Sequence, residues 1–542
     1  MKRLDTDVLV IGGGLAGLRA AIAARRSGAR VLVAVKGKLG RSGSSAMTTA
    51  GYAVACTDDG SGDRVGQHID DTLRGGCGIG EHDLVAALCA SAADELHYLG
   101  SLGVGFEMED QSLRRSPSGD HSRPRMVVPT NHIGTDITLP MVAELERLGV
   151  ARLEFAMAVE LIAADGHVSG AICLDTREGG ALLVSAGSVI LATGGAGRLF
   201  PITSNPNDVT GDGFALGWRA GARLRDMEFI QFYPWRCIDP FDKARVSIQP
   251  STFVLGARLY NARGERFMES FNPDGAEVTS RDIAARGIFE QIRQGLGVGG
   301  GVRLDLSALD RDSFAISNPK VARHCARLGI DYATYPFVVT PEAHFWMGGL
   351  AVDSDGATSI QGLYAVGECA GGVHGANRLN SNALPETLVF GARAGAHAAR
   401  RALAGPPPAE AAMTPHVPVA DDGMNQVELA EALSGLRACA WASLGIARER
   451  ASMETGLAHV RALRTDIEAR GAANLQALRA WHELGFLCDT AEMALVGALH
   501  REESRGAHFR DDFPLTDDSC WRGSIVLGRR GPDIDIAFAA AG

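Results

Sequence analysis

The N-terminal segment contains the feature that most constrains the fold: a short apolar strand, a glycine-rich turn and then a helix. Residues 7–11 are mostly apolar and β-branched, and after the turn apolar residues recur at helical spacing until a serine–glycine pair ends the helix. The turn carries Gly12, Gly14 and Gly17 in the pattern G-x-G-x-x-G. Such glycines allow a tight turn and let a pyrophosphate approach the helix N-terminus. The segment therefore predicts a Rossmann-like βαβ unit in an α/β fold.

The second strand of this unit is not followed by the usual acidic residue. A carboxylate at that place holds a ribose in common nicotinamide sites, but this strand ends in Val35 and Lys36. The difference argues against a standard nicotinamide site, and we expect Lys36 to lie beside whichever cofactor the turn binds. A glycine turn without a ligand stays an alternative, because the chain has 67 glycines and the pattern alone is weak.

Composition argues against several classes of protein. A chain of 542 residues predicts two or three structural units, and no apolar run approaches the roughly 20 residues of a membrane helix. The net charge of -11 argues against general binding to nucleic acid. The ten cysteines show no C-x-x-C pair and no metal-site spacing, so we expect no bound metal and a reduced, cytoplasmic setting.

Further segments are typical of a site that binds a cofactor. Two apolar runs end in glycine-containing turns, within 189–195 and 363–368, where an acid can hold a sugar hydroxyl. In order and spacing these segments closely resemble the flavoprotein subunit of succinate dehydrogenase and fumarate reductase, together with its relative L-aspartate oxidase. They are SVILATGGAGRLF (188–200), VTGDGFALGWRAGA (209–222), DMEFIQFYP (226–234), SRDIAARGI (280–288), HFWMGGL (344–350), GLYAVGECAGGVHGANRLNSNAL (362–384) and REESRGAHFRDDFP (501–514).

The resemblance spans nearly the whole chain and implies a divided architecture. A Rossmann-like FAD-binding domain is interrupted by an α+β capping domain and followed by a helical C-terminal domain. Alanine- and leucine-rich stretches after about residue 425 predict three helices, and the end of the chain predicts strand, turn and strand. The expected bounds are 1–230 and 345–404 for the FAD-binding domain, 231–344 for the capping domain, 405–424 for a proline-rich linker, 425–510 for the helical domain and 511–542 for a C-terminal tail.

The same resemblance implies which residues hold the cofactor. Asp212 and Glu368 match acids that bind FAD, and Ser381 and Leu384 match residues beside the flavin at the start of a helix. A simple turn or cap residue stays the alternative for each acid.

The attachment of FAD is implied by a single substitution. Membrane-bound relatives link FAD covalently through a histidine in a stretch that aligns on Gly51. That histidine corresponds to Ser44 here, and a serine hydroxyl cannot make the imidazole–flavin bond. We therefore expect FAD to be bound non-covalently.

Three residues match the part of the family's active site that this chain keeps. By resemblance, Arg378 grips a substrate carboxylate, His344 assists it and Arg281 moves a proton. A guanidinium suits the first task because it forms two parallel hydrogen bonds to a carboxylate and stays charged. On composition alone each of these residues would more simply be a surface or structural residue.

Other parts of that active site are replaced. Tyr233 stands where the family has a histidine for the second substrate carboxylate, and Gln249 stands where it has a threonine. Pro250 and Phe253 fall on the glutamate and arginine that relay protons. The glutamate that faces the substrate amine in aspartate oxidases falls near Ser118. We expect Tyr233 and Gln249 to form the far end of the pocket, Tyr233 either through its hydroxyl or as an aromatic wall.

These matches and losses lead to three hypotheses. The first is an FAD-dependent oxidoreductase that exchanges a hydride between flavin N5 and a carbon next to a carboxylate, in a small (di)carboxylate-like substrate other than plain succinate. The second is L-aspartate oxidase or fumarate reductase with a rearranged pocket. The third is an electron-transfer flavoprotein paired with an iron–sulfur or other electron-acceptor subunit. No direct membrane insertion is expected in any of them.

Overall fold

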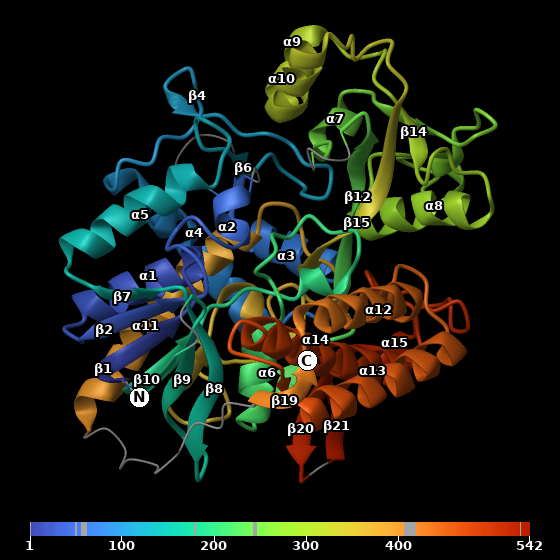
Figure 1. Cartoon of the computed structure of the whole chain (residues 1–542). Helices are drawn as coiled ribbons and strands as arrows, with labels where there is room; N and C mark the ends of the chain where they lie inside the picture. The colour runs from blue at the N-terminus through green and yellow to red at the C-terminus, as the bar shows by residue number, and fades with distance from the viewer. Residues whose placement is uncertain are drawn as a thin grey trace.

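The computed structural model describes residues 2–48, 51–55, 62–177, 180–241, 246–405, 419–531 and 533–541. A mixed sheet forms the centre of the N-terminal half, with strand order β7-β2-β1-β10-β9-β8 and β17 paired with β10 (Figure 1). β7, β2, β1, β10 and β17 run parallel, whereas β9 and β8 continue the sheet in antiparallel fashion. The bounds are β1 Lys2–Ile11, β2 Val31–Val35, β7 Ala151–Glu154, β8 Ala156–Ala164, β9 His167–Asp175, β10 Ala181–Leu191 and β17 Leu363–Ala365.

β1 is longer than its apolar run predicts. The expected strand covers residues 7–11, but pairing with β10 also draws in residues 2–6, which lie opposite residues 182–186. The apolar part is buried on both faces, since alternate side chains enter two different hydrophobic cores. Burial on both faces explains why the sequence shows a continuous apolar run there instead of an alternating one.

Helices cover one face of this sheet, and α11 lies against α1. Their apolar side chains share one core with alternate residues of β1 and β2. Because α1 follows β1 directly and α11 follows the segment after β17, both helices begin at the edge of the sheet where the parallel strands end. The helices are α1 Leu15–Arg26, α3 Val65–Gly75, α4 His82–Ser101, α5 Thr135–Arg147 and α11 Ala383–Ala404.

Short elements surround that edge. They are α2 Ser44–Met47, β3 Tyr52–Ala53, β4 Met108–Glu109, β5 Ser112–Leu113, β6 Met126–Val127 and α6 Asp212–Arg219.

A second sheet forms the cap, with strand order β12-β15-β14-β13 and a core of its own. β12 leaves the central part of the molecule and β15 returns to it as its antiparallel neighbour. The segment expected as the capping domain, 231–344, therefore lies between the first residues of β12 and the last of β15. Its elements are β12 Ile230–Asp239, α7 Ser251–Val254, β13 Arg258–Tyr260, α8 Arg281–Arg293, β14 Val302–Asp305, α9 Arg311–Ser317, α10 Pro319–Leu328 and β15 Phe337–Trp346.

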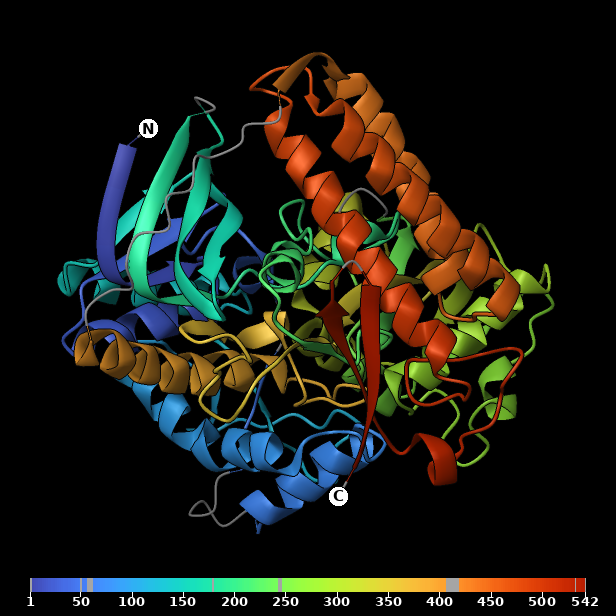
Figure 2. The same cartoon turned by 90° about the horizontal axis from the view of Figure 1, so that it is seen from below.

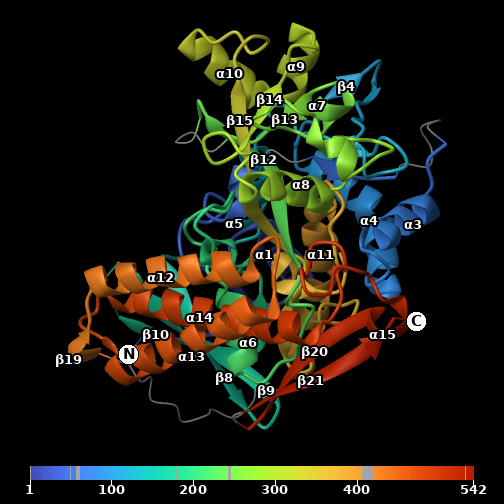
Figure 3. The same cartoon turned by 90° about the vertical axis from the view of Figure 1, so that its right-hand side faces the viewer.

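The C-terminal part contains the three long helices that the sequence predicts. Figures 2 and 3 show them side by side, with the antiparallel pair β20 and β21 next to them. β20 also pairs with β11, which joins this pair of strands to β16 and β18. The bounds are β11 Leu224–Arg225, β16 Gly349–Ala351, β18 Ala370–Gly371, α12 Gln426–Leu444, α13 Arg450–Arg470, α14 Leu478–His500, α15 Asp518–Trp521, β20 Gly523–Arg530 and β21 Asp533–Ala540.

The expected linker is only partly described. Residues 406–418 lie outside the described residues, and the strand β19, Val419–Met424, follows them. The last part of the expected linker is thus a strand, whose backbone bridges to Ala472. Among the described residues, no helix is long and apolar enough to cross a membrane.

Candidate active site

A cavity of about 1040 Å³ lies between the edge of the central sheet and the cap. Its wall contains the turn after β1, the end of β2, α2, the segment after β10, the start of α11 and parts of β12, α7, α8, α10 and β15. Of the residues predicted from sequence, the cavity is lined by Gly12, Gly14, Lys36, Ser44, Gly51, Asp212, Tyr233, Gln249, Arg281, His344, Glu368, Arg378, Ser381 and Leu384. Gly17 does not line it and lies one turn into α1.

The glycine turn at the base of the cavity is built by close backbone contacts. Gly12 has φ +120, and a Cβ there would lie 2.1 Å from the main-chain oxygen of Ala192 on the neighbouring segment. A Cβ on Gly17 would lie 2.1 Å from the oxygen of Gly12, so this glycine lets the helix pack on the turn. Gly14 is the N-cap of α1 and has no side chain, the N–H of Leu15 donates to Ser45 Oγ at 3.1 Å, and this end of the helix faces the cavity. This arrangement suits a phosphate group.

Lys36 and Asp212 meet in the cavity wall. The Nζ atom of Lys36 donates to Thr210 Oγ1 at 2.7 Å and lies 3.0 Å from a carboxylate oxygen of Asp212. Glu483, from α14 in the C-terminal part, lies 3.1 Å from the same Nζ atom. Burial lowers the pKa of Lys36, but the two carboxylates outweigh burial and raise it overall. The ammonium therefore stays charged and fixes the Asp212 side chain.

Two buried hydroxyls in the wall have no hydrogen-bond partner within the described part of the chain. They belong to Ser44, at the start of α2, and Ser381, just before α11. Ser381 adopts φ 65, a left-handed conformation that is uncommon for serine and fixes where its side chain lies. Buried polar groups are normally paired, so both hydroxyls indicate a ligand that completes the site.

Glu368 is buried against the same cavity. One of its carboxylate oxygens accepts a hydrogen bond from the main-chain N–H of Trp346 at 3.0 Å. Burial raises the pKa of Glu368 to about 7, although this hydrogen bond acts in the opposite direction. Near neutral pH the carboxyl group is therefore divided between its charged and neutral forms, and it can accept or donate a hydrogen bond.

Two buried arginines face the cavity and share one acceptor. Gln231 Oε1 accepts from Arg281 at 2.8 Å and from Arg378 at 3.0 Å. A second amide oxygen, Asn380 Oδ1, accepts from Arg281 at 2.5 Å. Among the described residues, neither guanidinium has a carboxylate within ion-pair distance, and the Nε atom of each has no hydrogen-bond partner. Burial lowers the pKa of both arginines, that of Arg378 to about 9 with further repulsion from Arg281.

Aromatic rings support the two cations. The guanidinium of Arg281 lies 5.0 Å from the ring centroid of Tyr233, and that of Arg378 lies 4.4 Å from the ring of Phe345. Such cation–π contacts offset part of the cost of burying a charge.

His344 lies next to this pair and is neutral. Burial, followed by the positive charges of Arg281 and Arg378, lowers the pKa of His344 well below 6.5. Its Nδ1 atom is 2.8 Å from the hydroxyl oxygen of Ser204. When Ser204 donates to Nδ1, the other ring nitrogen carries the proton and serves as a hydrogen-bond donor.

Tyr233 contributes its ring and not a free hydroxyl. The ring centroid lies 5.1 Å from that of His344, and the hydroxyl donates to the main-chain oxygen of Ile248 at 2.7 Å. Burial also raises the pKa of the phenol. Of the two roles considered for this residue, the contact favours the aromatic wall over a hydroxyl that serves the substrate.

Of the other replaced positions, Gln249 and Phe253 belong to the cap, whereas Ser118 lies in the N-terminal half. Gln249 lines the cavity and its main-chain N–H donates to Asn318. Phe253 is buried, with its ring 4.4 Å from that of Trp235, so it packs the cap core and carries no proton. Ser118 does not line the cavity and contacts the Asp120 carboxylate.

The sequence alone assigns no role to three residues that position the arginines. Gln231 and Asn380 supply the amide acceptors, and Asp120 accepts from the main-chain N–H of Asn380 at 2.7 Å. The negative charge of Asp120 raises the pKa of Arg281 and Arg378 against the larger effect of burial. Gln231 and Asn380 both lie in the motifs quoted above. The sequence does not show that their amide oxygens accept from the arginines, because that depends on how the two segments meet in the fold.

Comparisons with known proteins place the chain in a family. Residues 7–384 match the family described as FAD binding domain, and residues 434–538 match the one described as fumarate reductase flavoprotein C-term. The chain is 35% identical to a subunit of the fumarate reductase (CoM/CoB) of Methanothermobacter marburgensis over 97% of each chain. It is 34% identical to an L-aspartate oxidase of Nostoc sp., over 94% of this chain and 91% of that protein. The chain belongs to the fumarate reductase and L-aspartate oxidase family of FAD-dependent oxidoreductases.

The structure of this flavoprotein agrees with its family. The E. coli quinol fumarate reductase FrdA chain matches it with a TM-score of 0.88 at 26% identity, covering 100% of this chain and 97% of that one. The predicted fold class and the prediction of FAD as cofactor are therefore confirmed. The substrate of the flavoprotein is a separate question, because relatives with two different activities match it almost equally well.

The residues of the cavity fit FAD. The N-terminus of α1 faces the cavity and suits its pyrophosphate, and the hydroxyls of Ser44 and Ser381, which have no partner among the described residues, offer hydrogen bonds to FAD. Ser44 lines the cavity at the start of α2 and has no imidazole to offer a covalent link.

Proposed function

We propose that this flavoprotein exchanges a hydride between FAD and a carbon next to a carboxylate, in a small (di)carboxylate-like substrate other than plain succinate. One observation carries the proposal: Arg281 and Arg378 are buried beside the cavity with only neutral amide and carbonyl acceptors. A buried charge is unfavourable unless an opposite charge compensates it. A substrate carboxylate would supply the missing negative charge.

Arg378 is our candidate for the group that holds this carboxylate. Its Nε atom is without a partner among the described residues, and a guanidinium can offer two parallel donors to a carboxylate. The bound anion would also relieve the repulsion between Arg378 and Arg281, which helps to lower the pKa of Arg378. His344, neutral and hydrogen-bonded to Ser204, would add a donor without adding charge.

Arg281 is our candidate for the group that moves a proton at the second carbon. Gln231 and Asn380 hold its two terminal nitrogens, which fixes the guanidinium relative to Arg378. Burial lowers the pKa of Arg281, which makes its proton easier to give up. FAD, when bound, would supply or accept the hydride, while the protein orients the substrate.

The far end of the pocket argues against plain succinate. Tyr233 binds the main chain through its hydroxyl, and Phe253 is packed on Trp235. Neither offers a cation to a second carboxylate separated from the first by two methylene groups, as in succinate. A rearranged L-aspartate oxidase or fumarate reductase stays the alternative, supported by the relatives of both kinds.

A panel of carboxylates tests the proposal. The purified flavoprotein is reduced without oxygen, and its yellow colour is followed on addition of unsaturated mono- and dicarboxylates; the oxidised form is followed with saturated and amino acids. We expect succinate, fumarate and L-aspartate to react poorly and another carboxylate to react faster. Turnover of succinate or aspartate at ordinary enzymatic rates, on the order of 1–1000 per second, would favour the alternative. No reaction with any carboxylate would contradict the proposal itself.

A partner subunit is a further proposal. One relative bears the name of a subunit, so we propose that this cytoplasmic flavoprotein passes electrons to an iron–sulfur or other electron-acceptor subunit. Purification from the native cell at low salt, followed by iron analysis of whatever co-elutes, would test it. Full turnover by the isolated chain with oxygen as acceptor would count against a required partner.

A further inference from the structure

The cap helix α10 carries basic side chains along one face. Their spacing is i, i+3, i+4 and i+7, which places them on a single stripe of the helix. All of them line the cavity that contains the buried arginines. The other side of the helix packs Val321 and Cys325 into the core of the cap. The stripe, here called the basic face of α10, consists of Lys320, Arg323, His324 and Arg327.

No described acidic side chain lies within ion-pair distance of the basic face. Arg323 donates to the main-chain oxygen of Pro319 at 3.2 Å, and Arg327 contacts Nδ1 of His324 at 3.1 Å. Burial lowers the pKa of Lys320, and the neighbouring charge of Arg323 lowers it further. Burial and Arg327 likewise lower the pKa of His324. These basic groups thus repel each other. Their local positive charge contrasts with the net charge of the chain, which is -11.

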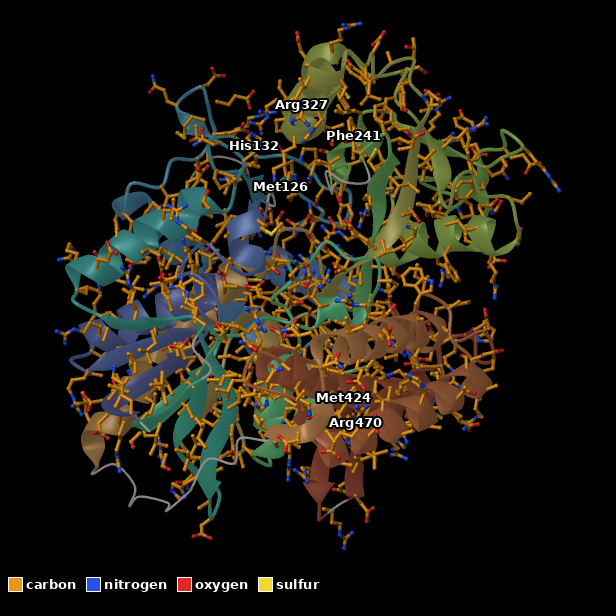
Figure 4. All side chains as sticks on the ribbon, viewed as in Figure 1. Met126, His132, Phe241, Arg327, Met424 and Arg470 are labelled. Atoms are coloured by element: carbon orange, nitrogen blue, oxygen red, sulfur yellow. The ribbon has the colours of Figure 1, made fainter. Side chains whose placement is uncertain are left out.

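On the opposite wall of the cavity, the described acid Glu107 already pairs with other basic groups. Figure 4 shows Arg327 on the cap and His132 across from it on the central part of the molecule. His132 and Arg114 both line the cavity there, and both contact Glu107, at 2.6 and 3.2 Å. Glu107 is therefore already engaged by two basic groups on its own side of the cavity.

We propose that the basic face of α10 binds a second anionic group of the substrate, remote from the carboxylate held by Arg378. The inference rests on the proposed function and adds a substrate class to it: a carboxylate longer than succinate with a distal carboxylate, phosphate or sulfonate. Besides Arg281 and Arg378, the described lysines and arginines that line the cavity without a carboxylate partner are Lys320, Arg323 and Arg327.

The absence of a cation at Tyr233 and the presence of the basic face of α10 support the same substrate class. Tyr233 offers no positive charge to a second carboxylate, and Phe253 does not line the cavity. The basic face of α10 lies on the cap and lines the same cavity as Tyr233 and Arg378. A longer substrate could therefore place one anion on Arg378 and the other on α10. Because Arg323 and Arg327 are exposed to solvent, they would contribute mainly to affinity and association, and salt would weaken their effect.

The test compares the wild type with the triple variant Lys320→Gln, Arg323→Gln, Arg327→Gln. Titration calorimetry on the FAD-loaded protein uses two saturated acids of equal length, one with a carboxylate at each end and one ending in a methyl group. The matched control is Arg311→Gln, an exposed arginine of α9 that pairs with Asp331 and does not line the cavity.

We expect the wild type to prefer the two-ended acid and the triple variant to lose that preference by about tenfold, because three partly exposed cationic contacts are removed. The one-ended acid and the control variant should show no change. The preference of the wild type should also fall as salt is raised from 50 to 300 mM.

An unchanged preference in the triple variant would overturn the inference. So would a wild type that binds both acids equally. The readout is binding and not turnover, so it distinguishes the inference from the proposed function. Binding of the two-ended acid without flavin chemistry on any carboxylate would contradict the proposed function and leave the anion site standing.

Discussion

At the scale of single residues, the site depends on a neutral amide placed between two cations. Gln231 Nε2 donates to Asn377 Oδ1 and to the main-chain oxygen of Arg378, both at 2.8 Å, and this turns Oε1 toward the two guanidiniums. Glutamine accepts from both arginines without neutralising them. The arginines are thereby held in place while their charge is left for a substrate.

Gln231→Glu should impair catalysis. A carboxylate of the same size would pair with both arginines and occupy the charge meant for the substrate. One of its oxygens would also replace the Nε2 donor that faces Asn377 Oδ1 and the main-chain oxygen of Arg378, so the gain and the loss oppose each other in stability. We expect a KM raised at least tenfold in steady-state kinetics. Gln231→Leu is the control, because it removes the acceptor and the donor together and should lower both stability and activity. An unchanged KM in the glutamate variant would show that the charge of the two arginines is not used to bind the substrate.

Arg378→Lys should preserve the charge and lose the geometry. A lysine offers a single ammonium where the guanidinium offers two parallel donors, and the cation–π contact with Phe345 would weaken. We expect kcat/KM to fall by about 30- to 1000-fold, equivalent to roughly 2–4 kcal/mol of transition-state stabilisation. Steady-state kinetics on a carboxylate identified from the panel measures this. Wild-type values in the variant would remove Arg378 from the proposed clamp.

Ser44 decides how the cofactor is retained. Because its hydroxyl cannot form the link that a histidine makes, FAD should be released when the protein is precipitated with acid, leaving the yellow colour in the supernatant. A denaturing gel should show no fluorescent protein band. Fluorescence that stays with the polypeptide would show a covalent link through some other residue.

At the scale of secondary-structure elements, the C-terminal segment is tied to the cap's first strand by a buried ion pair. Arg501, just after α14, donates to a carboxylate oxygen of Glu228 at 2.8 Å, and both side chains are 0% exposed. Arg448 donates to the main-chain oxygen of Glu228 at 2.7 Å. Glu228 precedes β12, the strand that carries Gln231 and Tyr233, so this contact helps to position the site from a distant part of the sequence.

Arg501→Met should be strongly destabilising. It leaves Glu228 buried without its charge partner, which costs about 3–5 kcal/mol in comparable sites. Burial already raises the pKa of Glu228, so the variant should unfold more readily as pH rises. The double variant Arg501→Met, Glu228→Gln should recover part of the loss in thermal unfolding. Arg530→Met, on the exposed end of β20, is the matched control and should unfold like the wild type. Additive effects in the double variant would show that the two side chains are not coupled.

The elements were predicted from sequence where local rules decide them. The glycine turn, the apolar strands and the three C-terminal helices follow from spacing alone. Residues 2–6 of β1 were missed because only pairing with β10 makes that polar stretch a strand. The basic face of α10 was missed for a similar reason, since its lysine and arginines look like an ordinary solvated helix until the fold places them in the cavity. Likewise, nothing local shows that the Tyr233 hydroxyl binds Ile248.

At the scale of the whole molecule, buried histidines lie where distant parts of the chain meet. His68 on α3 contacts Asn382 at the start of α11 at 2.9 Å, and His344 lies between the cap and the central part. His508 lies in the C-terminal part, where its Nδ1 accepts from Arg448 at 2.9 Å. Burial lowers the pKa of all three, that of His68 to about 4 and the other two well below 6.5. Protonation would therefore place an uncompensated charge at each of these contacts.

The molecule should lose stability as pH falls below about 6.5. In that range the unfolded chain binds a proton at each histidine and the folded chain does not, so the free energy of unfolding decreases by about 1.4 kcal/mol per pH unit for each of them. Glu368 acts in the opposite sense between about pH 7 and 4.5, because its pKa in the folded protein is raised to about 7. Burial raises the pKa of Glu228 and Asp489 as well, which adds to the effect of Glu368. Burial also lowers the pKa of His324, His482 and His500, so six histidines oppose three acids and decide the sign. His508→Gln keeps an acceptor for Arg448 but cannot be protonated, so its melting temperature should fall less steeply between pH 6.5 and 5 than that of the wild type. The exposed His459→Gln is the control and should follow the wild type. If the melting temperatures of the wild type and His508→Gln fall in parallel with pH, protonation of His508 does not contribute to the loss of stability in acid.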